Sequence, residues 1–77
     1  MVTMSEDLTD LQRTILEFIL SNSSRPSAIT SVVRRKNPEV NQNDIVQALL
    51  DLESRRLAER VSGKAWSATS RAEGVLG

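Results

Sequence analysis

The side chains of this chain that could do chemistry are carboxylates, hydroxyls, amides and cations, because its 77 residues include no cysteine and no histidine. Without these two residue types, disulfides, zinc ribbons, thiol nucleophiles, Ser-His-Asp triads and His-ligated iron sites are all excluded. Carboxylates are plentiful, but no two of them stand at a spacing typical of acid–base or metal chemistry. We therefore expect no catalytic site, no metal and no cofactor, and we expect that the protein is not an enzyme.

The cations are grouped along the chain, although the ten basic and ten acidic residues cancel to a net charge of zero. One basic block carries Arg25, Arg34, Arg35 and Lys36 without an acid, and a second carries Arg55, Arg56, Arg60 and Lys64 with Glu59. Charges that complement helix dipoles explain part of this grouping. The alternative is a basic face that forms on folding, although a net charge of zero argues against a nucleic-acid partner.

The first helix is expected to begin at Thr9, where residues 9–12 form a capping box between the Thr9 hydroxyl and the Gln12 side chain. Apolar residues then recur at the spacing of a buried helical stripe, and the polar run 21–24 ends the helix. The stripe consists of Leu11, Ile15, Phe18 and Ile19, followed by Asn22. Leu8, Leu16 and Leu20 lie partly off this stripe, so they either wrap a small core or form an exposed edge through which two copies pair.

The second helix is expected to open at Pro26, with Ser27 as its cap. Its apolar residues are Ile29, Val32 and Val33. Pro38 disfavours a helical conformation at Asn37, so this helix should end near Lys36.

The third helix is predicted over residues 41–54, with Asn41 as cap, Asp44 as the reciprocal acid, and Val40 packed on Ile45. Its inward stripe consists of Ile45, Ala48, Leu49 and Leu52. The short connection 37–40 between the second and third helices is typical of a helix-turn-helix.

Beyond residue 54 the apolar residues alternate, which predicts strands at 57–61 and 65–69. Ser62-Gly63-Lys64 is the expected hairpin turn, with Gly63 available for a positive φ angle. Trp66 is expected to anchor this hairpin in the core. A capping box at 70–73 opens at most two turns of helix, which Gly74 and Gly77 should end.

These elements fit one small domain covering residues 1–77, with residues 1–7 expected to be flexible. A chain of this length buries only about 60% of its unfolded surface, so a second subunit would add needed stability. No apolar run approaches the roughly 20 residues of a membrane span, and the acidic N-terminus is unlike a secretion signal. We expect a cytoplasmic protein with no membrane partner.

Three helices followed by a hairpin are the element order of a winged helix-turn-helix domain, and the residues resemble that family over about 8–76. The end of the third helix is similar to a recognition helix that runs into the first wing strand, in Leu49-x-x-Leu52-Glu53-x-x-x-Leu57 with Arg60. The second strand is similar to the end of the wing in small repressors of the MarR and PadR type, in Trp66-x-Ala68-Thr69 with Gly74.

The resemblance implies a mainly α fold of the α+β kind, in which a three-helix bundle is followed by a C-terminal β-hairpin wing. The chain departs from the family at two places. Arg56 stands where many members have glycine before the strand, and the turn at 62–64 is shorter than usual.

In the winged-helix family the third helix usually enters the DNA major groove, so the resemblance implies that the outward face of residues 41–54 contacts bases. The candidates for base contacts are Gln42, Asn43, Val46 and Gln47, with Leu50 beside them. Asn and Gln can bond adenine through two hydrogen bonds, and Val can contact a thymine methyl. The alternative is that they are ordinary solvated residues, since this face has no cation, and Asp44 and Asp51 would repel phosphates.

The candidates for phosphate contacts are Arg34, Arg35, Lys36, Arg60 and Lys64. In a winged helix these two groups can flank the recognition helix, where they would neutralise phosphates and release counterions. Compensation of the helix dipole explains the first group by itself, and solubility explains the second. These roles explain less well why both basic groups lack close acids except Glu59. Arg55 and Arg56 are expected to compensate the helix dipole first and to contact phosphate second.

The function favoured by this resemblance is sequence-specific binding of double-stranded DNA by a small transcriptional regulator that acts as a homodimer, without cofactor or small-molecule ligand. The competing hypothesis is a winged helix that binds another protein through Leu16, Leu20 and Leu50. Zero net charge and the two acids of the third helix favour this alternative.

Overall fold

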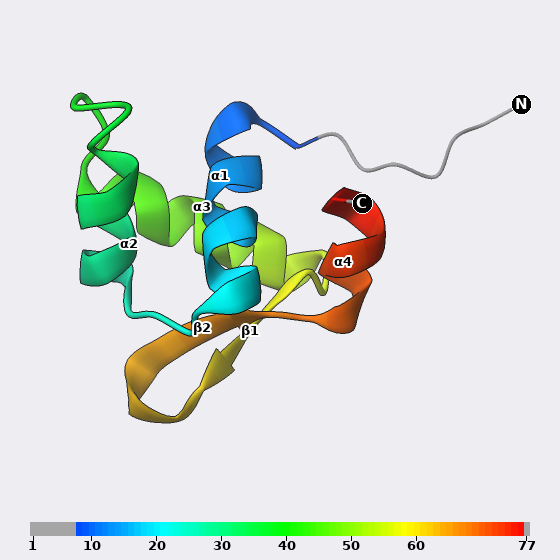
Figure 1. Cartoon of the computed structure of the whole chain (residues 1–77). Helices are drawn as coiled ribbons and strands as arrows, with labels where there is room; N and C mark the ends of the chain where they lie inside the picture. The colour runs from blue at the N-terminus through cyan, green and yellow to red at the C-terminus, as the bar shows by residue number, and fades with distance from the viewer. Residues whose placement is uncertain (1–7, 77) are drawn as a thin grey trace, which may run out of the picture.

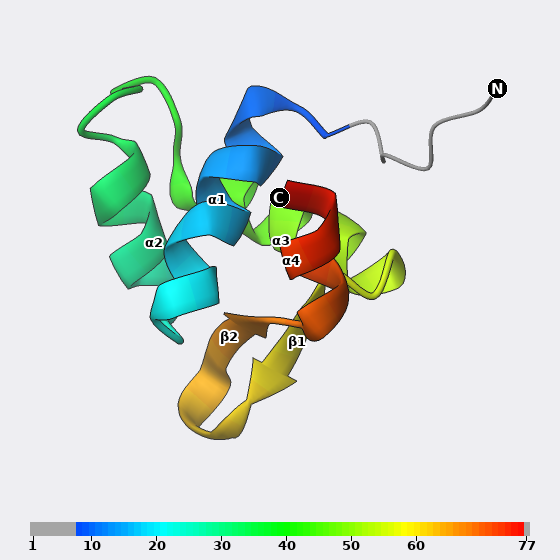
Figure 2. The same cartoon turned by 45° about the vertical axis from the view of Figure 1, so that its right-hand side comes forward.

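The computed structural model describes residues 8–76. The elements are α1 (Asp10–Ser21), α2 (Pro26–Val33), α3 (Gln42–Ser54), β1 (Ala58–Val61), a 3-10 turn (Ser62–Lys64), β2 (Ala65–Ala68) and α4 (Ser70–Leu76) (Figure 1). Figures 1 and 2 show α1 crossing α3 between α2 and α4, while the hairpin projects from one end of the bundle. The predicted fold class, a helical bundle with a β-hairpin wing, is therefore confirmed. The expected flexibility of residues 1–7 lies outside the described residues.

The first helix begins as predicted but buries one more leucine than its stripe indicated. The Gln12 N–H donates to Thr9 Oγ1 at 3.0 Å, and the Thr9 N–H donates back to Gln12 Oε1 at 3.1 Å. Leu16 is fully buried with Ile15, whereas Leu20 keeps 40% of its surface exposed. Of the two alternatives for the leucines off the stripe, Leu16 follows the first and joins the core, because α2, α3 and α4 all pack against α1 and widen its buried face.

Both ends of the second helix differ from the prediction. Its N-cap is Arg25 and not Ser27, because Pro26 occupies the first helical position. At the other end, α2 stops at Val33 and not near Lys36. The N–H groups of the next residues bond carbonyls three residues back, Arg35 to Val32 and Lys36 to Val33, so the chain tightens into turns before Pro38.

The third helix follows the prediction closely. Asn41 and Asp44 form the reciprocal capping box, with N–H···O distances of 2.9 and 3.1 Å. The inward stripe of Ile45, Ala48, Leu49 and Leu52 is buried, and Val40 joins the same core. This stripe holds α3 against α1 and α2 and leaves its opposite side exposed.

The wing consists of β1, the turn Ser62–Lys64 and β2, paired antiparallel from Ala58↔Ala68 to Val61↔Ala65. Trp66 is only 6% exposed, so the prediction that it anchors the hairpin in the core is confirmed. Gly63 adopts the expected positive φ of 75°, and Lys64 follows at 63°.

Arg56 also lies in the left-handed region, with a φ of 64°. This is the position where the resemblance led us to expect glycine, and left-handed backbone is what glycine adopts without steric cost. The Thr69 hydroxyl donates to the Arg56 carbonyl at 2.7 Å, which stabilises the arginine in this conformation. The backbone therefore keeps the sharp turn between α3 and the wing although the glycine is missing.

The last helix, α4, runs through Gly74 to Leu76, so the prediction that Gly74 ends it was wrong. Ala72 is fully buried, and Val75 and Leu76 pack partly on the core. These contacts outweigh the roughly 1 kcal/mol that glycine costs inside a helix. The helix continues to the end of the described residues, and the predicted stop at Gly77 lies outside them.

A membrane-spanning helix is not found among residues 8–76. The longest helix there, α3, has 13 residues, whereas a span needs roughly 20.

Candidate nucleic-acid interface

The outward face of α3 carries the predicted base-contacting side chains. Gln42, Asn43 and Gln47 are exposed, Val46 is half-buried, and Leu50 is 37% exposed. With 3.6 residues per turn, these positions share one side of the helix, opposite the buried stripe. The structure therefore brings together all four candidates for base contacts. We call this surface the outward face.

The two acids that were expected to repel phosphates lie at one edge of α3. Asp51 accepts a hydrogen bond from Gln12 Nε2 of α1 and pairs with Arg55 at 3.1 Å. Asp44 stands two helical turns earlier on the same edge and accepts from the Asn41 N–H. Both carboxylates are thus engaged within the fold, on the edge that faces α1. Glu53 follows Val46 and Leu50 by seven and three residues, so it borders the outward face, and its carboxylate pairs with Arg60.

The opposite edge of α3 faces the wing. Glu53 on this edge pairs with Arg60 of β1 at 3.3 Å. The Arg60 guanidinium also lies over the Trp66 ring, 5.0 Å from its centroid, an arrangement that favours a cation. The expectation that both basic groups lack close acids except Glu59 was therefore wrong, because Glu53 pairs with Arg60. Neighbouring residues on a strand point to opposite faces, so Glu59 and Arg60 diverge.

A groove of about 540 Å³ separates the start of α2 from the wing. It is lined by Arg25, Pro26, Ser27, Gln42, Arg60, Val61, Lys64 and Trp66. We call it the wing groove. Three of these residues are cations, and none of the described residues that line it is an acid. Gln42 belongs both to this groove and to the outward face, so the two surfaces are continuous.

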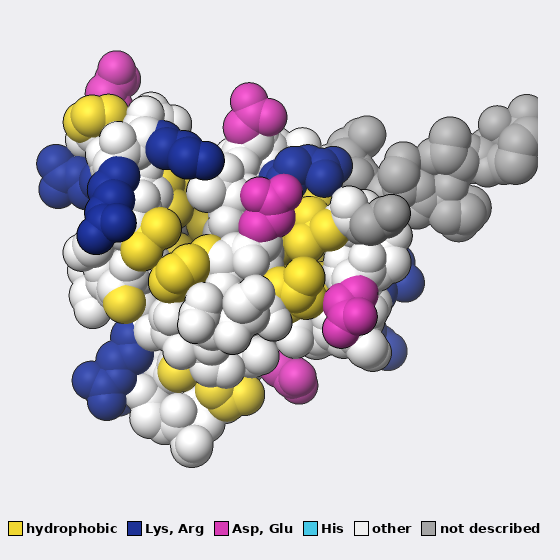
Figure 3. Space-filling model, in the orientation of Figure 1, with side chains coloured by type: hydrophobic (Ala, Val, Ile, Leu, Met, Phe, Trp, Pro, Cys, Tyr) yellow, Lys and Arg dark blue, Asp and Glu magenta, His cyan; other side chains and the backbone are white. Residues whose placement is uncertain are grey.

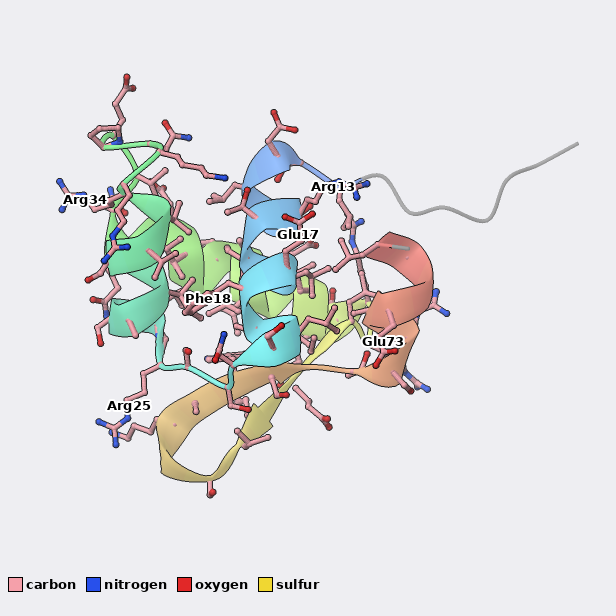
Figure 4. The ribbon with its side chains drawn as sticks, in the orientation of Figure 1. Arg13, Glu17, Phe18, Arg25, Arg34 and Glu73 are labelled. Carbon is pink, nitrogen blue, oxygen red and sulfur yellow. The ribbon has the colours of Figure 1, made fainter. Side chains whose placement is uncertain are left out.

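Arg25 is the residue of this groove that sequence reasoning missed as a candidate. Its Nε–H donates to the Gly63 carbonyl of the wing turn at 2.9 Å, and Figure 4 shows it beside the wing. The available signal was its place in the basic block at 25–36. Its separation along the chain from the hairpin concealed the contact.

The remaining phosphate candidates, Arg34, Arg35 and Lys36, are exposed in the turns after α2. Figure 4 shows Arg34 at the opposite end of α2 from Arg25, and eight helical residues span about 12 Å. Lys36 lines a small hollow of about 50 Å³ with Asp10 and Thr14 of α1. The structure therefore does not bring this group together with Arg60 and Lys64.

The charges on the face seen in Figure 3 follow the same division. The Lys and Arg side chains on its left side form two groups, one near the turns after α2 and one beside the wing. Acidic side chains lie mainly over α1 and α4. Residues 8–76 contain no cluster of three or more potential metal ligands among their acids.

Comparison with known proteins relates this arrangement to solved structures. No protein-family model matches the chain, and no curated protein sequence matches it significantly. RosR from H. salinarum matches with a TM-score of 0.82 and 22% identity, over 92% of this chain and 69% of RosR. A further RosR structure, the complex RosR-S4, gives a TM-score of 0.83 at 22% identity, over 92% of this chain and 66% of that one.

Wild-type ZitR from Lactococcus lactis matches with a TM-score of 0.77 and 22% identity, over 99% of this chain and 53% of ZitR. ZitR is described as a zinc-responsive MarR family member. The chain thus spans about two thirds of RosR and about half of ZitR. The similarity to these structures confirms the predicted winged helix-turn-helix fold.

Proposed function

We propose that this protein binds double-stranded DNA sequence-specifically, as a small transcriptional regulator that works in the cytoplasm. In this proposal α3 enters the major groove with its outward face, and the wing lies along the sugar-phosphate backbone. The observation that carries it is the continuity of two surfaces through Gln42: an outward face with exposed amides and the wing groove with three cations. The regulators that share this fold support the same proposal.

The phosphate contacts come from both basic groups. Arg60 and Lys64 lie in the wing groove, next to the start of α3. Arg34, Arg35 and Lys36 form the second group, at the far end of α2. The ion pair with Glu53 holds Arg60 in place, and 62% of the Arg60 side chain stays exposed, so its guanidinium remains accessible to a phosphate.

The base contacts are tested by replacing Asn43 and Gln47 with alanine, one at a time. The two residues stand one helical turn apart on the outward face, and each amide offers the donor and acceptor that adenine presents. Each substitution should cost about 1–3 kcal/mol at one or two base pairs and leave binding to unrelated DNA nearly unchanged. Fluorescence anisotropy with a duplex selected by the wild-type protein from a randomised pool, and with its single-base variants, measures this.

The matched control is Asn22→Ala, which removes an exposed amide from the end of α1. Thermal unfolding of all three variants should stay within about 0.5 kcal/mol of wild type, since the replaced side chains are on the surface. Unchanged discrimination in both α3 variants would mean that α3 does not contact the bases.

A homodimer is the second part of the proposal. Two recognition helices on one DNA face reach half-sites about 34–36 Å apart, so the selected sequence should be palindromic. Leu20 remains exposed for such pairing, whereas Leu16 is buried. Light scattering should give twice the 8.5 kDa chain mass. A monomer at tens of micromolar, both free and on DNA, would remove the dimer and leave DNA binding intact.

The competing hypothesis, that the protein binds another protein, relied on a contact surface of which one residue is buried in the structure. Leu16 is completely buried, so the predicted contact surface of Leu16, Leu20 and Leu50 was wrong in that residue. Leu20 and Leu50 remain exposed on different helices, α1 and α3. Leu50 lies on the outward face beside Gln47, where the DNA proposal also uses it.

A further inference from the structure

The connection between α1 and α2 is hydrogen-bonded to the wing at two places, one in β2 and one in the wing turn. The Ser24 N–H donates to the Trp66 carbonyl at 3.0 Å, and the Trp66 N–H donates to the Ser24 carbonyl at 2.8 Å. Next along the chain, Arg25 Nε–H donates to the Gly63 carbonyl at 2.9 Å. The backbone pair holds the base of the wing, and the Arg25 side chain reaches its turn.

The turn that Arg25 contacts has an unusual backbone. Gly63 and Lys64 both have positive φ angles, 75° and 63°. Lysine rarely adopts this conformation, because its Cβ crowds the backbone there. A hydrogen bond to the Gly63 carbonyl stabilises the turn immediately before Lys64, and so helps to fix the direction of the Lys64 side chain, which lines the wing groove.

Arg25 is well suited to a contact other than helix capping. It is the N-cap residue of α2, but its side chain makes no capping hydrogen bond. Its guanidinium donates to the wing through Nε–H. One of its terminal nitrogens lies 3.9 Å from the point that a Cβ atom would occupy if residue 63 were not glycine. A guanidinium carries five N–H donors, so donors remain for an anion after the bond to Gly63.

The charges around the groove favour a polyanion. Arg25, Arg60 and Lys64 line it from two sides, and their mutual repulsion is offset in the described residues by one ion pair, that of Arg60 with Glu53. Because the groove continues into the outward face through Gln42, a DNA strand beside α3 would pass over these cations.

We propose that Arg25 is a positioning residue that holds the wing turn against α2, so that Arg25, Lys64 and Arg60 together bind the phosphates of one DNA strand. This inference rests on the proposed function and adds to it a contact that couples the wing to the helix-turn-helix. Arg25 acts twice in it, as a phosphate ligand and as the residue that orients Lys64.

The positioning role is tested first in the 77-residue chain without DNA, by amide hydrogen exchange read by NMR. Arg25→Ala and Arg25→Lys should both speed exchange at the amides of residues 63–65 about two- to tenfold, as expected for the loss of one hydrogen bond. Arg13→Ala removes the same charge from α1, on the other side of the molecule in Figure 4, and should leave these amides unchanged. Equal exchange in wild type and both Arg25 variants would overturn the positioning role.

Phosphate binding is tested with a fluorescein-labelled duplex of about 30 base pairs, three helical turns, at several salt concentrations. Arg25→Ala should weaken binding and reduce the slope of log K against log salt by about one. Arg25→Lys should keep the slope but lower the affinity about threefold, because the charge stays while the wing turn loosens. Arg13→Ala should change neither quantity.

The outcomes separate the phosphate site at Arg25 from the proposed function. A loss of affinity in Arg25→Ala no larger than in Arg13→Ala would overturn the phosphate site. Failure of the wild-type protein to bind the duplex at low salt would overturn the proposed function and the phosphate site with it. In that case the exchange measurement still shows whether Arg25 holds the wing.

Discussion

Replacing Leu16 with alanine is expected to lower the free energy of unfolding by about 2–5 kcal/mol, whereas Leu20→Ala should change it by less than about 1 kcal/mol. Leu16 is completely buried in the core cluster, and Leu20 is 40% exposed one turn later on the same helix. A domain of this size has a total stability of roughly 4–12 kcal/mol, so the first substitution removes a large part of it.

Urea denaturation followed by the fluorescence of Trp66, the one tryptophan of the chain, measures both variants. Trp66 is buried against the same core, so its emission reports on global unfolding. The matched pair also tests the origin of the effect, since both substitutions remove the same atoms from α1. Equal stabilities of the two variants would contradict the burial of Leu16 and restore it as a surface residue.

The second large effect is the salt dependence of DNA binding. Five phosphate contacts per protomer, from Arg34, Arg35, Lys36, Arg60 and Lys64, give a slope of log K against log salt of roughly −4 to −5. Affinity should then fall roughly 250- to 1,000-fold between 50 and 200 mM salt. Anisotropy titrations over this range measure the slope, and a contact from Arg25 would make it steeper by about one.

Block substitutions separate the two basic groups, which lie at opposite ends of α2. Alanine at Arg34, Arg35 and Lys36 should flatten the slope by about 2.7, and alanine at Arg60 and Lys64 by about 1.8. Both blocks should weaken binding to all sequences alike. A wild-type slope near zero, or no binding at low salt, would favour the protein-interaction hypothesis.

The parts of the fold that could be predicted from the sequence depend on neighbouring residues. The capping boxes at Thr9 and Asn41 are each complete within four residues. The buried stripe of α3 follows from helical spacing alone, and the hairpin turn follows from Gly63. In each case the residues that determine the local structure are close together in the sequence, so their pattern alone was enough to predict it.

The parts that could not be predicted depend on what packs from elsewhere in the chain. Leu16 is buried because three helices surround α1, and α4 continues through Gly74 because Ala72 docks on the core. Periodicity describes one helix at a time, so it underestimates a face that several partners cover. Tertiary contacts also override the local tendency of glycine to end a helix.

The candidate site also has one part that the sequence could predict and another that it could not. The outward face of α3 could be listed from the sequence because it is the complement of the buried stripe. The contacts Arg25–Gly63, Arg60–Glu53 and Gln12–Asp51 join different elements, and no spacing rule connects their partners. The sequence could therefore name the cations but not which of them share a groove.

The backbone pair between Ser24 and Trp66 has a consequence for folding. A two-stranded hairpin is marginally stable in water by itself, and here β2 is bonded to β1 on one edge and to the connection after α1 on the other. The second partner is distant in sequence, and such contacts form slowly because a long loop must close first. The wing should therefore reach its final stability only when α1 and α2 are packed, which makes helices and hairpin one cooperative folding unit.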